Sequence, residues 1–173
     1  MRRSLIVSAP VLVLGALCAC RAHRTDAAPA TGVELRTDSA KYTVRLDRSV
    51  YRVEVGYAFT NRTGKTLSMN VCHLPSPPVL EKEIAAGRWV GAYTRVELMC
   101  LTDPPFRVAS GTTHRGIVGA AGPPRGAKRF DGWTVDSIPG TYRLTWTLHA
   151  SADPNDKAGT ITAVSPSFQL KDP

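Results

Sequence analysis

The chain has 173 residues, with 22 Lys or Arg against 14 Asp or Glu, so its formal net charge is +8 at pH 7. The basic residues are scattered along the chain and form no stripe interleaved with aromatic residues. This pattern gives nucleic-acid binding little support. We therefore expect no nucleic-acid partner and a solvated basic surface.

The first twenty residues have the three parts of a secretory signal. Arg2 and Arg3 form a cationic start, and an apolar run from Leu5 to Leu17 follows. This run is too short to span a bilayer, which needs about 20 apolar residues. Small residues then lead to Cys20.

The segment Leu17-Cys18-Ala19-Cys20 resembles the lipobox of bacterial lipoproteins. Leu17, Ala19 and Cys20 match that motif, whereas Cys18 departs from it. The resemblance implies removal of residues 1–19 and acylation of Cys20, for example with palmitate. The mature protein would then be attached through lipid to a membrane of the bacterial cell envelope, in the periplasm or at the cell surface. Ordinary secretion and an uncleaved anchor are the alternatives.

Residues 20–32 have no apolar periodicity and contain small, polar and proline residues, which is typical of a tether. Without residues 1–19 the chain keeps 20 basic and 14 acidic residues, a net charge of +6. A basic exported protein is attracted to anionic lipids and envelope polymers. Residues 33–173 have the length of a single domain.

Cleavage before Cys20 would remove Cys18, and acylation would use Cys20. Cys72 and Cys100 are the cysteines that remain. An even number of cysteines in an oxidising compartment predicts a disulfide. The bridge would close a loop of about 29 residues and stabilise the domain by roughly 3–4 kcal/mol in the chain-entropy model. Two free cysteines are the alternative.

The clearest predicted strand covers residues 51–59, which alternate with period 2. One face of this strand would carry Tyr51, Val53, Val55, Tyr57 and Phe59. Turn-forming residues 61–65 come next and are followed by a second alternating run, 66–72. We expect these two runs to form a hairpin or a strand pair across a tight connection.

The same analysis predicts further short strands at 33–35, 42–46, 79–84, 88–93, 96–101, 106–109, 112–118 and 141–150, and a final one through Phe168 and Leu170. Strands 79–84 and 88–93 are expected to pair with each other, as are 106–109 and 112–118. A loop rich in Gly and Pro is expected at 120–126. In the strand 141–150, one face would carry Tyr142, Leu144, Trp146 and Leu148.

Short strands with turn signals every 8–12 residues, and no sustained helical period, predict an all-β antiparallel sandwich of about seven to nine strands. Pro-Gly-Thr-Tyr-Arg-Leu at 139–144 resembles the start of a late strand in bacterial immunoglobulin-like and fibronectin-like domains. Residues 59–67 resemble an early hairpin of the same domains, and both features occur in the bacterial intracellular-proteinase-inhibitor-like sandwich. The resemblance implies an immunoglobulin-like fold with Tyr142 in its core.

Function in a sandwich resides mainly in its loops. The loop residues of distinctive chemistry, which we take as a possible binding loop set, are His73, Trp89, Tyr93, Arg125 and Trp133. For the two tryptophans, packing in the core or at its rim is the more common role, and binding is the alternative.

The remaining candidates for chemistry have simpler interpretations. His73, His114 and His149, with Met69 and Met99, lack the spacing of a copper site, and residues 153–159 lack that of an EF-hand. Asn61-Arg62-Thr63 has the form of a glycosylation acceptor, but we interpret it as a turn. The motifs of the common hydrolases and nucleotide-binding enzymes are missing.

We therefore expect a protein with no enzymatic activity, no cofactor and no metal. The first hypothesis is an exported, lipid-anchored module that binds an envelope protein or polymer. The second is a protease inhibitor that presents residues 120–128 to a protease, and the third is a metal-binding or enzymatic envelope domain.

Overall fold

The computed structural model describes residues 32–69, 76–95, 104–124, 132–150 and 159–172, which contain fourteen strands and no helix. In chain order these strands are β1 (Val33–Thr37), β2 (Lys41–Thr43), β3 (Arg45–Asp47), β4 (Val50–Asn61), β5 (Leu67–Met69), β6 (Val79–Ala85), β7 (Arg88–Gly91), β8 (Tyr93–Thr94), β9 (Phe106–Val108), β10 (Thr113–Gly122), β11 (Gly132–Trp133), β12 (Gly140–His149), β13 (Thr160–Val164) and β14 (Phe168–Lys171). Over these ranges, no helix long and apolar enough to cross a membrane is present.

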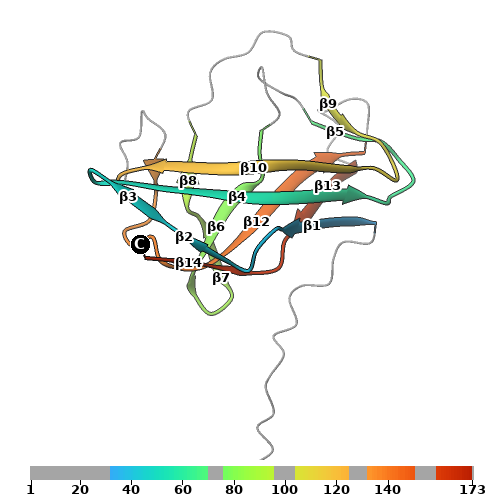
Figure 1. Cartoon of the computed structure of the whole chain (residues 1–173). Helices are drawn as coiled ribbons and strands as arrows, with labels where there is room; N and C mark the ends of the chain where they lie inside the picture. Colours follow the sequence, from blue (N-terminus) through green and yellow to red (C-terminus); the bar gives the residue numbers. More distant parts are fainter. Residues whose placement is uncertain (1–31, 70–75, 96–103, 125–131, 151–158, 173) are drawn as a thin grey trace, which may run out of the picture.

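The strands form two main sheets, and the predicted all-β sandwich is confirmed (Figure 1). The first sheet has the order β1-β4-β10, with β3 also paired to β4. The second has the order β2-β14-β12-β5-β9, with β13 and β6 on β12 and β7 on β6, while β8 and β11 form a separate ribbon. The strands outnumber the seven to nine expected because several are pieces of two to four residues, such as β2 and β3 on either side of Val44.

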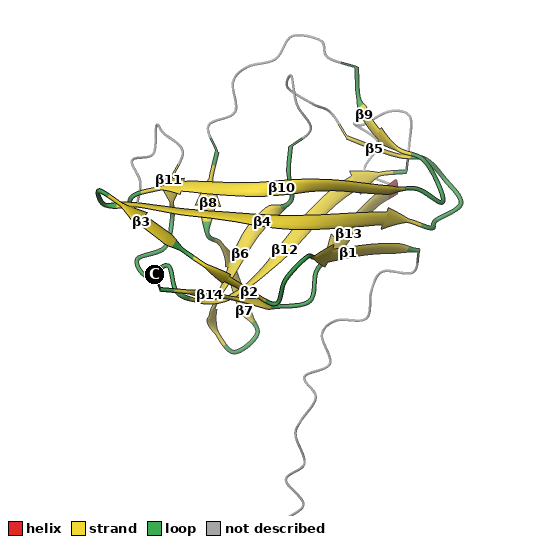
Figure 2. Ribbon diagram, in the orientation of Figure 1, coloured by secondary structure: helices red, strands yellow, loops and turns green. Residues whose placement is uncertain are grey.

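One strand pair departs from the antiparallel pattern. Strand β2 runs parallel to β14, with Leu170 opposite Tyr42. The chain leaves the first sheet after β1 and joins the edge of the second sheet as β2. In Figure 2 the loop of residues 38–40 joins β1 to β2 along the lower side of the sandwich.

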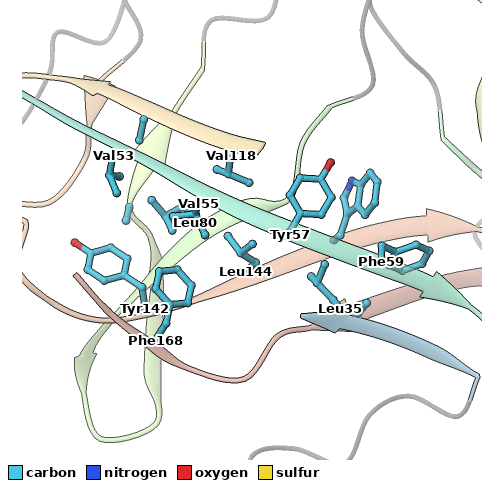
Figure 3. Close-up of a cluster of buried hydrophobic side chains, with 14 of the residues drawn as sticks. Leu35, Val53, Val55, Tyr57, Phe59, Leu80, Val118, Tyr142, Leu144 and Phe168 are labelled. Atoms are coloured by element: carbon cyan, nitrogen blue, oxygen red, sulfur yellow. The ribbon is translucent and has the colours of Figure 1, made fainter. Parts of the chain in front are cut away.

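The core lies between the long strands β4 and β12, whose alternation is confirmed. The inward residues of β12 are all buried, as are four of the five predicted for β4; the fifth, Tyr51, is half-buried. Figure 3 shows the aliphatic centre of this core around Val55, Leu80 and Leu144. At one end Trp146 of β12 meets Tyr57 and Phe59 of β4 edge-to-face, with ring centroids 5.5 and 5.1 Å apart. Such aromatic pairs stabilise beyond the area they bury.

Tyr142 anchors the start of β12, as the resemblance implied. Its side chain is fully buried, and its hydroxyl donates a hydrogen bond to the carbonyl oxygen of Ile138, four residues earlier. This is the arrangement called a tyrosine corner in immunoglobulin-like domains. Burial raises the pKa of Tyr142 well above its usual value. The bond fixes the path by which residues 138–140 enter the strand.

The expected hairpin of 51–59 with 66–72 is wrong. Strand β4 lies in the first sheet, whereas β5 lies in the second, where Leu67 pairs with Val108 and Ser68 with His149. The connection 62–66 is therefore an arch between sheets. The side chain of Asn61 holds it: Nδ2 donates to the carbonyl oxygens of Lys65 and Val108, both at 2.8 Å, and Oδ1 accepts from the Thr63 amide and hydroxyl.

The expected pairing of 106–109 with 112–118 is wrong for the same reason. Strand β9 pairs with β5 in the second sheet, and β10 pairs with β4 in the first. The loop expected at 120–126 also begins later than predicted, because β10 continues to Gly122, which lies opposite Tyr51. A period-2 pattern shows that a strand has a buried face but does not distinguish a hairpin from an arch.

The hairpin of β6 and β7 is confirmed, with Gly87 in the left-handed region at φ 74° at its turn. The predicted final strand is two strands, β13 and β14, separated by residues 165–167. The strand expected at 96–101 and the turn at 153–158 lie outside the described residues. Figure 1 shows the β6–β7 hairpin projecting beyond β14.

Asn61→Ala should destabilise the domain by about 2–4 kcal/mol, because it leaves several backbone groups without a partner and each buried orphan costs about 1–3 kcal/mol. Asn61→Asp should be similarly severe, since a carboxylate cannot donate to Lys65 and Val108. Urea unfolding measures both. Thr63→Val is the matched control, because it removes the hydroxyl bonds of Thr63 to Asn61 and Lys65 but keeps both bonds that Nδ2 of Asn61 donates. A loss no larger than that of the control would contradict this role of Asn61.

Tyr142→Phe should lower the free energy of unfolding by about 1–3 kcal/mol near neutral pH, because the buried Ile138 carbonyl loses its donor. The pKa of Tyr142 is raised in the folded state, so ionisation favours unfolding. Stability should fall as pH rises above the ordinary tyrosine pKa of 10.0. The variant should lose less stability than the wild type over that alkaline range. Parallel alkaline unfolding curves for the two proteins would contradict the prediction.

Candidate functional site

Two of the predicted binding residues belong to the core. Trp133 is fully buried, and its Nε1 donates to the carbonyl oxygen of Tyr51 at 3.1 Å. Tyr93 packs edge-to-face on Trp133, with centroids 5.7 Å apart, and its hydroxyl donates to the Ala121 carbonyl oxygen at 3.0 Å. These contacts fasten the β8–β11 ribbon to the ends of β4 and β10. Trp133 is therefore a packing residue. The prediction that it belongs to a binding loop is wrong, because its side chain is buried.

Trp89 is the described member of the predicted set that lines a cavity. His73 and Arg125 lie outside the described residues, as do Cys20, Cys72 and Cys100. The structure therefore places Trp89 away from Tyr93 and Trp133, which serve a different part of the fold. The binding role of Trp89 stays a prediction, and the residues with which it was grouped do not line the same cavity.

The cavity is a groove of about 900 Å³ on the outside of the sandwich. This volume lies in the upper part of the range of about 300–1,000 Å³ usual for ligand sites. Three segments line the groove: Glu34–Ala40 from β1 and the crossing to β2, the β6–β7 hairpin, and Val164–Ser167 together with Arg143. We call it the hairpin groove. Its walls come from both sheets, so it exists only after they have packed together.

Arg143 and Trp89 form a stacked pair in the hairpin groove. The Cζ atom of Arg143 lies 4.4 Å from the centroid of the Trp89 ring, a cation–π contact. The Nε of Arg143 donates to Oε2 of Glu81 at 2.7 Å, and both side chains are about three-quarters buried. Stacking and ion pairing together hold the guanidinium flat in one orientation. Sequence analysis missed Arg143 because its outward position on β12 resembles that of any solvated residue.

The other charged groups of the groove also have partners. Glu34 pairs with Arg36 and, at 3.5 Å, with Arg62. Oδ1 of Asp38 accepts the hydroxyl hydrogen of Tyr42. Burial, followed by this bond to Asp38, raises the pKa of Tyr42 to about 12.

Glu83 and Ser165 stabilise the backbone at two rims of the groove. Oε1 of Glu83 accepts from the Gly87 amide at 2.9 Å, which closes the hairpin turn. The hydroxyl of Ser165 accepts from the Leu144 amide at 2.9 Å and donates to the carbonyl oxygen of Pro166. The rims are therefore shaped before any ligand arrives.

A second cluster of aromatic rings surrounds His114 at the other end of the core. Its ring lies 4.8 Å from Phe106, 5.7 Å from Trp146 and 6.0 Å from Tyr57, measured between centroids. Burial lowers the pKa of His114 and raises that of Tyr57. These contacts give His114 a packing role.

No group of three or more His, Cys, Asp or Glu within the described ranges is arranged to hold a metal ion. The His149 ring lies beside Thr160, with Nδ1 3.2 Å from the hydroxyl oxygen. The hairpin groove offers a ligand hydrogen-bonding groups, namely carboxylates, a guanidinium and hydroxyls. It also offers one apolar aromatic surface, the indole of Trp89.

No protein-family model matches this chain. No curated protein is similar to it in sequence. Among solved structures, it is similar to the X-ray structure of Northeast Structural Genomics Consortium target SoR45, with 13% identity, a TM-score of 0.42, and coverage of 82% of this chain and 85% of that one.

Proposed function

We propose that this protein is a non-enzymatic, lipid-anchored module of the bacterial cell envelope that binds an envelope component in the hairpin groove. The observation that carries the proposal is the groove itself, in which stacked Trp89 and Arg143 face residues Glu34–Ala40. Its side chains are paired with one another, an arrangement suited to holding a ligand in a fixed geometry. A preformed groove with a few oriented polar groups is the usual form of a binding site.

The location in the envelope rests on Cys20 and the signal before it. Acylation at Cys20 would place the anchor 13 residues before Val33, where β1 begins. A chain of that length spans at most about 45 Å when fully extended. The tether thus allows the domain to stand away from the membrane and to reach components of the envelope.

The fold also favours the Cys72–Cys100 disulfide as part of this proposal. Strands β5 and β9 pair with Met69 opposite Phe106, so the chain leaves β5 and enters β9 at the same end of the pair. Cys72 follows Met69 by three residues and Cys100 precedes Phe106 by six. Extended segments of these lengths reach about 10 and 20 Å, which allows the Cα separation of about 4.4–6.8 Å that a disulfide needs.

The protease-inhibitor alternative gains no support from the described residues. The first three residues of its proposed loop, Ala120–Gly122, are the paired end of β10 and not an exposed segment. The metal-binding alternative lacks a ligand cluster in the same described ranges. The binding module therefore stands as the proposal.

Non-reducing peptide mapping of the exported protein should yield one peptide pair joined through Cys72 and Cys100. The reduced protein should lose roughly 3–4 kcal/mol of stability, because the closed loop restricts the unfolded chain. Cys72→Ser and Cys100→Ser should cost about the same, and the double variant should cost no more than either single variant. Two alkylatable thiols in the native protein would overturn the disulfide.

The functional proposal is tested with two substitutions in the full-length chain. Cys20→Ala should abolish lipid labelling and release the protein from the membrane fraction. Ser167→Trp should fill the groove from an exposed position and abolish co-sedimentation of the detergent-purified protein with detergent-extracted bacterial envelopes.

Thr147→Trp is the matched control for the groove variant, because Thr147 is also exposed and lies on β12 outside the groove. It should leave co-sedimentation unchanged. Lipid labelling of Cys20→Ala would refute the anchor. Equal co-sedimentation of Ser167→Trp and wild type, or none by the wild type, would refute the binding role of the groove.

A further inference from the structure

Both arginines that line the hairpin groove, Arg36 and Arg143, already have carboxylate partners. Glu34 is paired with Arg36 and Arg62, and Glu81 is paired with Arg143. The Asp38 carboxylate accepts the Tyr42 hydroxyl. An anionic ligand would have to compete with Glu81 for Arg143. Both members of that pair are about three-quarters buried, so breaking it leaves a charge without compensation. The paired arginines of the groove therefore favour a ligand without negative charge.

The same groups retain capacity for further hydrogen bonds. A guanidinium has five N–H donors in a planar fork, and a carboxylate has two acceptor oxygens. Arg143 uses its Nε on Glu81 and presents its remaining donors in a plane fixed by Trp89. Asp38 adds a carboxylate to the lining. Neighbouring hydroxyls of a sugar ring both donate and accept, so they fit a wall that offers donors and acceptors side by side.

The indole of Trp89 supplies the apolar component. Trp combines a large apolar surface with a rigid shape and is frequent at binding sites. A sugar ring has an apolar face of C–H groups and an equatorial rim of hydroxyls. The groove has the same division, with the indole in the hairpin and polar groups from Glu34–Ala40 and Ser165–Ser167 around it.

A peptide fits this groove less well than a sugar chain. Extended peptides commonly bind by adding a strand to an exposed sheet edge. Strand β1 lines the groove, but Val33 and Leu35 are only 5% and 2% exposed. Their backbone groups are therefore closed to an incoming strand, and recognition would have to rest on side chains.

From these observations we infer that the hairpin groove binds a neutral oligosaccharide segment. Trp89 contacts the C–H face of a sugar ring, and Arg143 and Asp38 bind its hydroxyls. The inference rests on the proposed function, because it names the ligand class of the same groove. The volume of about 900 Å³ is larger than a single sugar ring requires, so the ligand is a stretch of a polymer.

The test uses the full-length protein in detergent and a panel of defined probes. The neutral probes are pentamers of N-acetylglucosamine, of β-linked glucose and of α-linked glucose. The charged probes are the glucosamine pentamer, which is cationic, and the galacturonate pentamer, which is anionic. Tetra-alanine is the peptide probe. Calorimetric titration gives the affinity, and tryptophan fluorescence gives an independent signal.

At least one neutral pentamer should bind more tightly than either charged pentamer and the peptide. Trp89→Ala and Ser167→Trp should each weaken that binding by at least about tenfold, as expected when a central binding Trp is lost or blocked. Thr147→Trp should bind like the wild type. Ser167→Trp keeps the test valid if Trp89→Ala fails to fold, because Ser167 is exposed.

The outcomes distinguish the sugar assignment from the proposed binding role of the groove. Binding of only a charged pentamer or the peptide, or of no probe, overturns the sugar assignment, while co-sedimentation with envelopes independently reports the binding role. Binding of a neutral pentamer that both groove variants leave unchanged overturns the sugar assignment and places the ligand elsewhere on the protein. If both variants also sediment with envelopes like the wild type, the proposed function fails as well.

Discussion

The buried amide of Asn61 is the interaction on which the arrangement of the two sheets depends. Asn61 ends β4 and is fully buried, and its side chain binds the carbonyl oxygens of Lys65 and Val108. Its backbone amide donates to Thr112 and its carbonyl oxygen accepts from Gly111. One residue therefore holds both arches, from β4 to β5 and from β9 to β10. Because such a network works only when every member is satisfied, it specifies one way for the chain to change sheets.

Two adjacent residues on β12 connect the core to the candidate site. Tyr142 points inward and bonds to Ile138, while Arg143 points outward and stacks on Trp89. Successive side chains point to opposite faces of a strand. The tyrosine corner fixes where β12 begins and which way Tyr142 points, so it also fixes the opposite direction of Arg143. The strand that builds the core therefore also positions the Arg143–Trp89 pair of the groove. A binding site supported in this way loses little conformational freedom when a ligand binds.

The candidate site was only partly predictable. Trp89 stood out as a large aromatic residue beside a turn, and it does line the groove. Trp133 stood out for the same reason, yet it is buried against Tyr51. Nothing in the local sequence separates these two tryptophans, because their exposure depends on which distant strands cover them. Arg143 and Asp38 carried no signal, since a charged residue at an outward position is most often solvated.

The sequence by itself determined the all-β class, the inward faces of β4 and β12, and the burial of Tyr142. These features depend on residues close together in the chain. The export signal ending at Cys20 stays a prediction. Only the tertiary structure decided that β5 and β9 leave the sheet of β4 and β10, and that Glu34–Ala40, Trp89 and Arg143 share one groove. Alternation marks which face of a strand is buried, whereas the choice of partner strand depends on long-range packing and on side chains such as Asn61 that satisfy the backbone at a crossing.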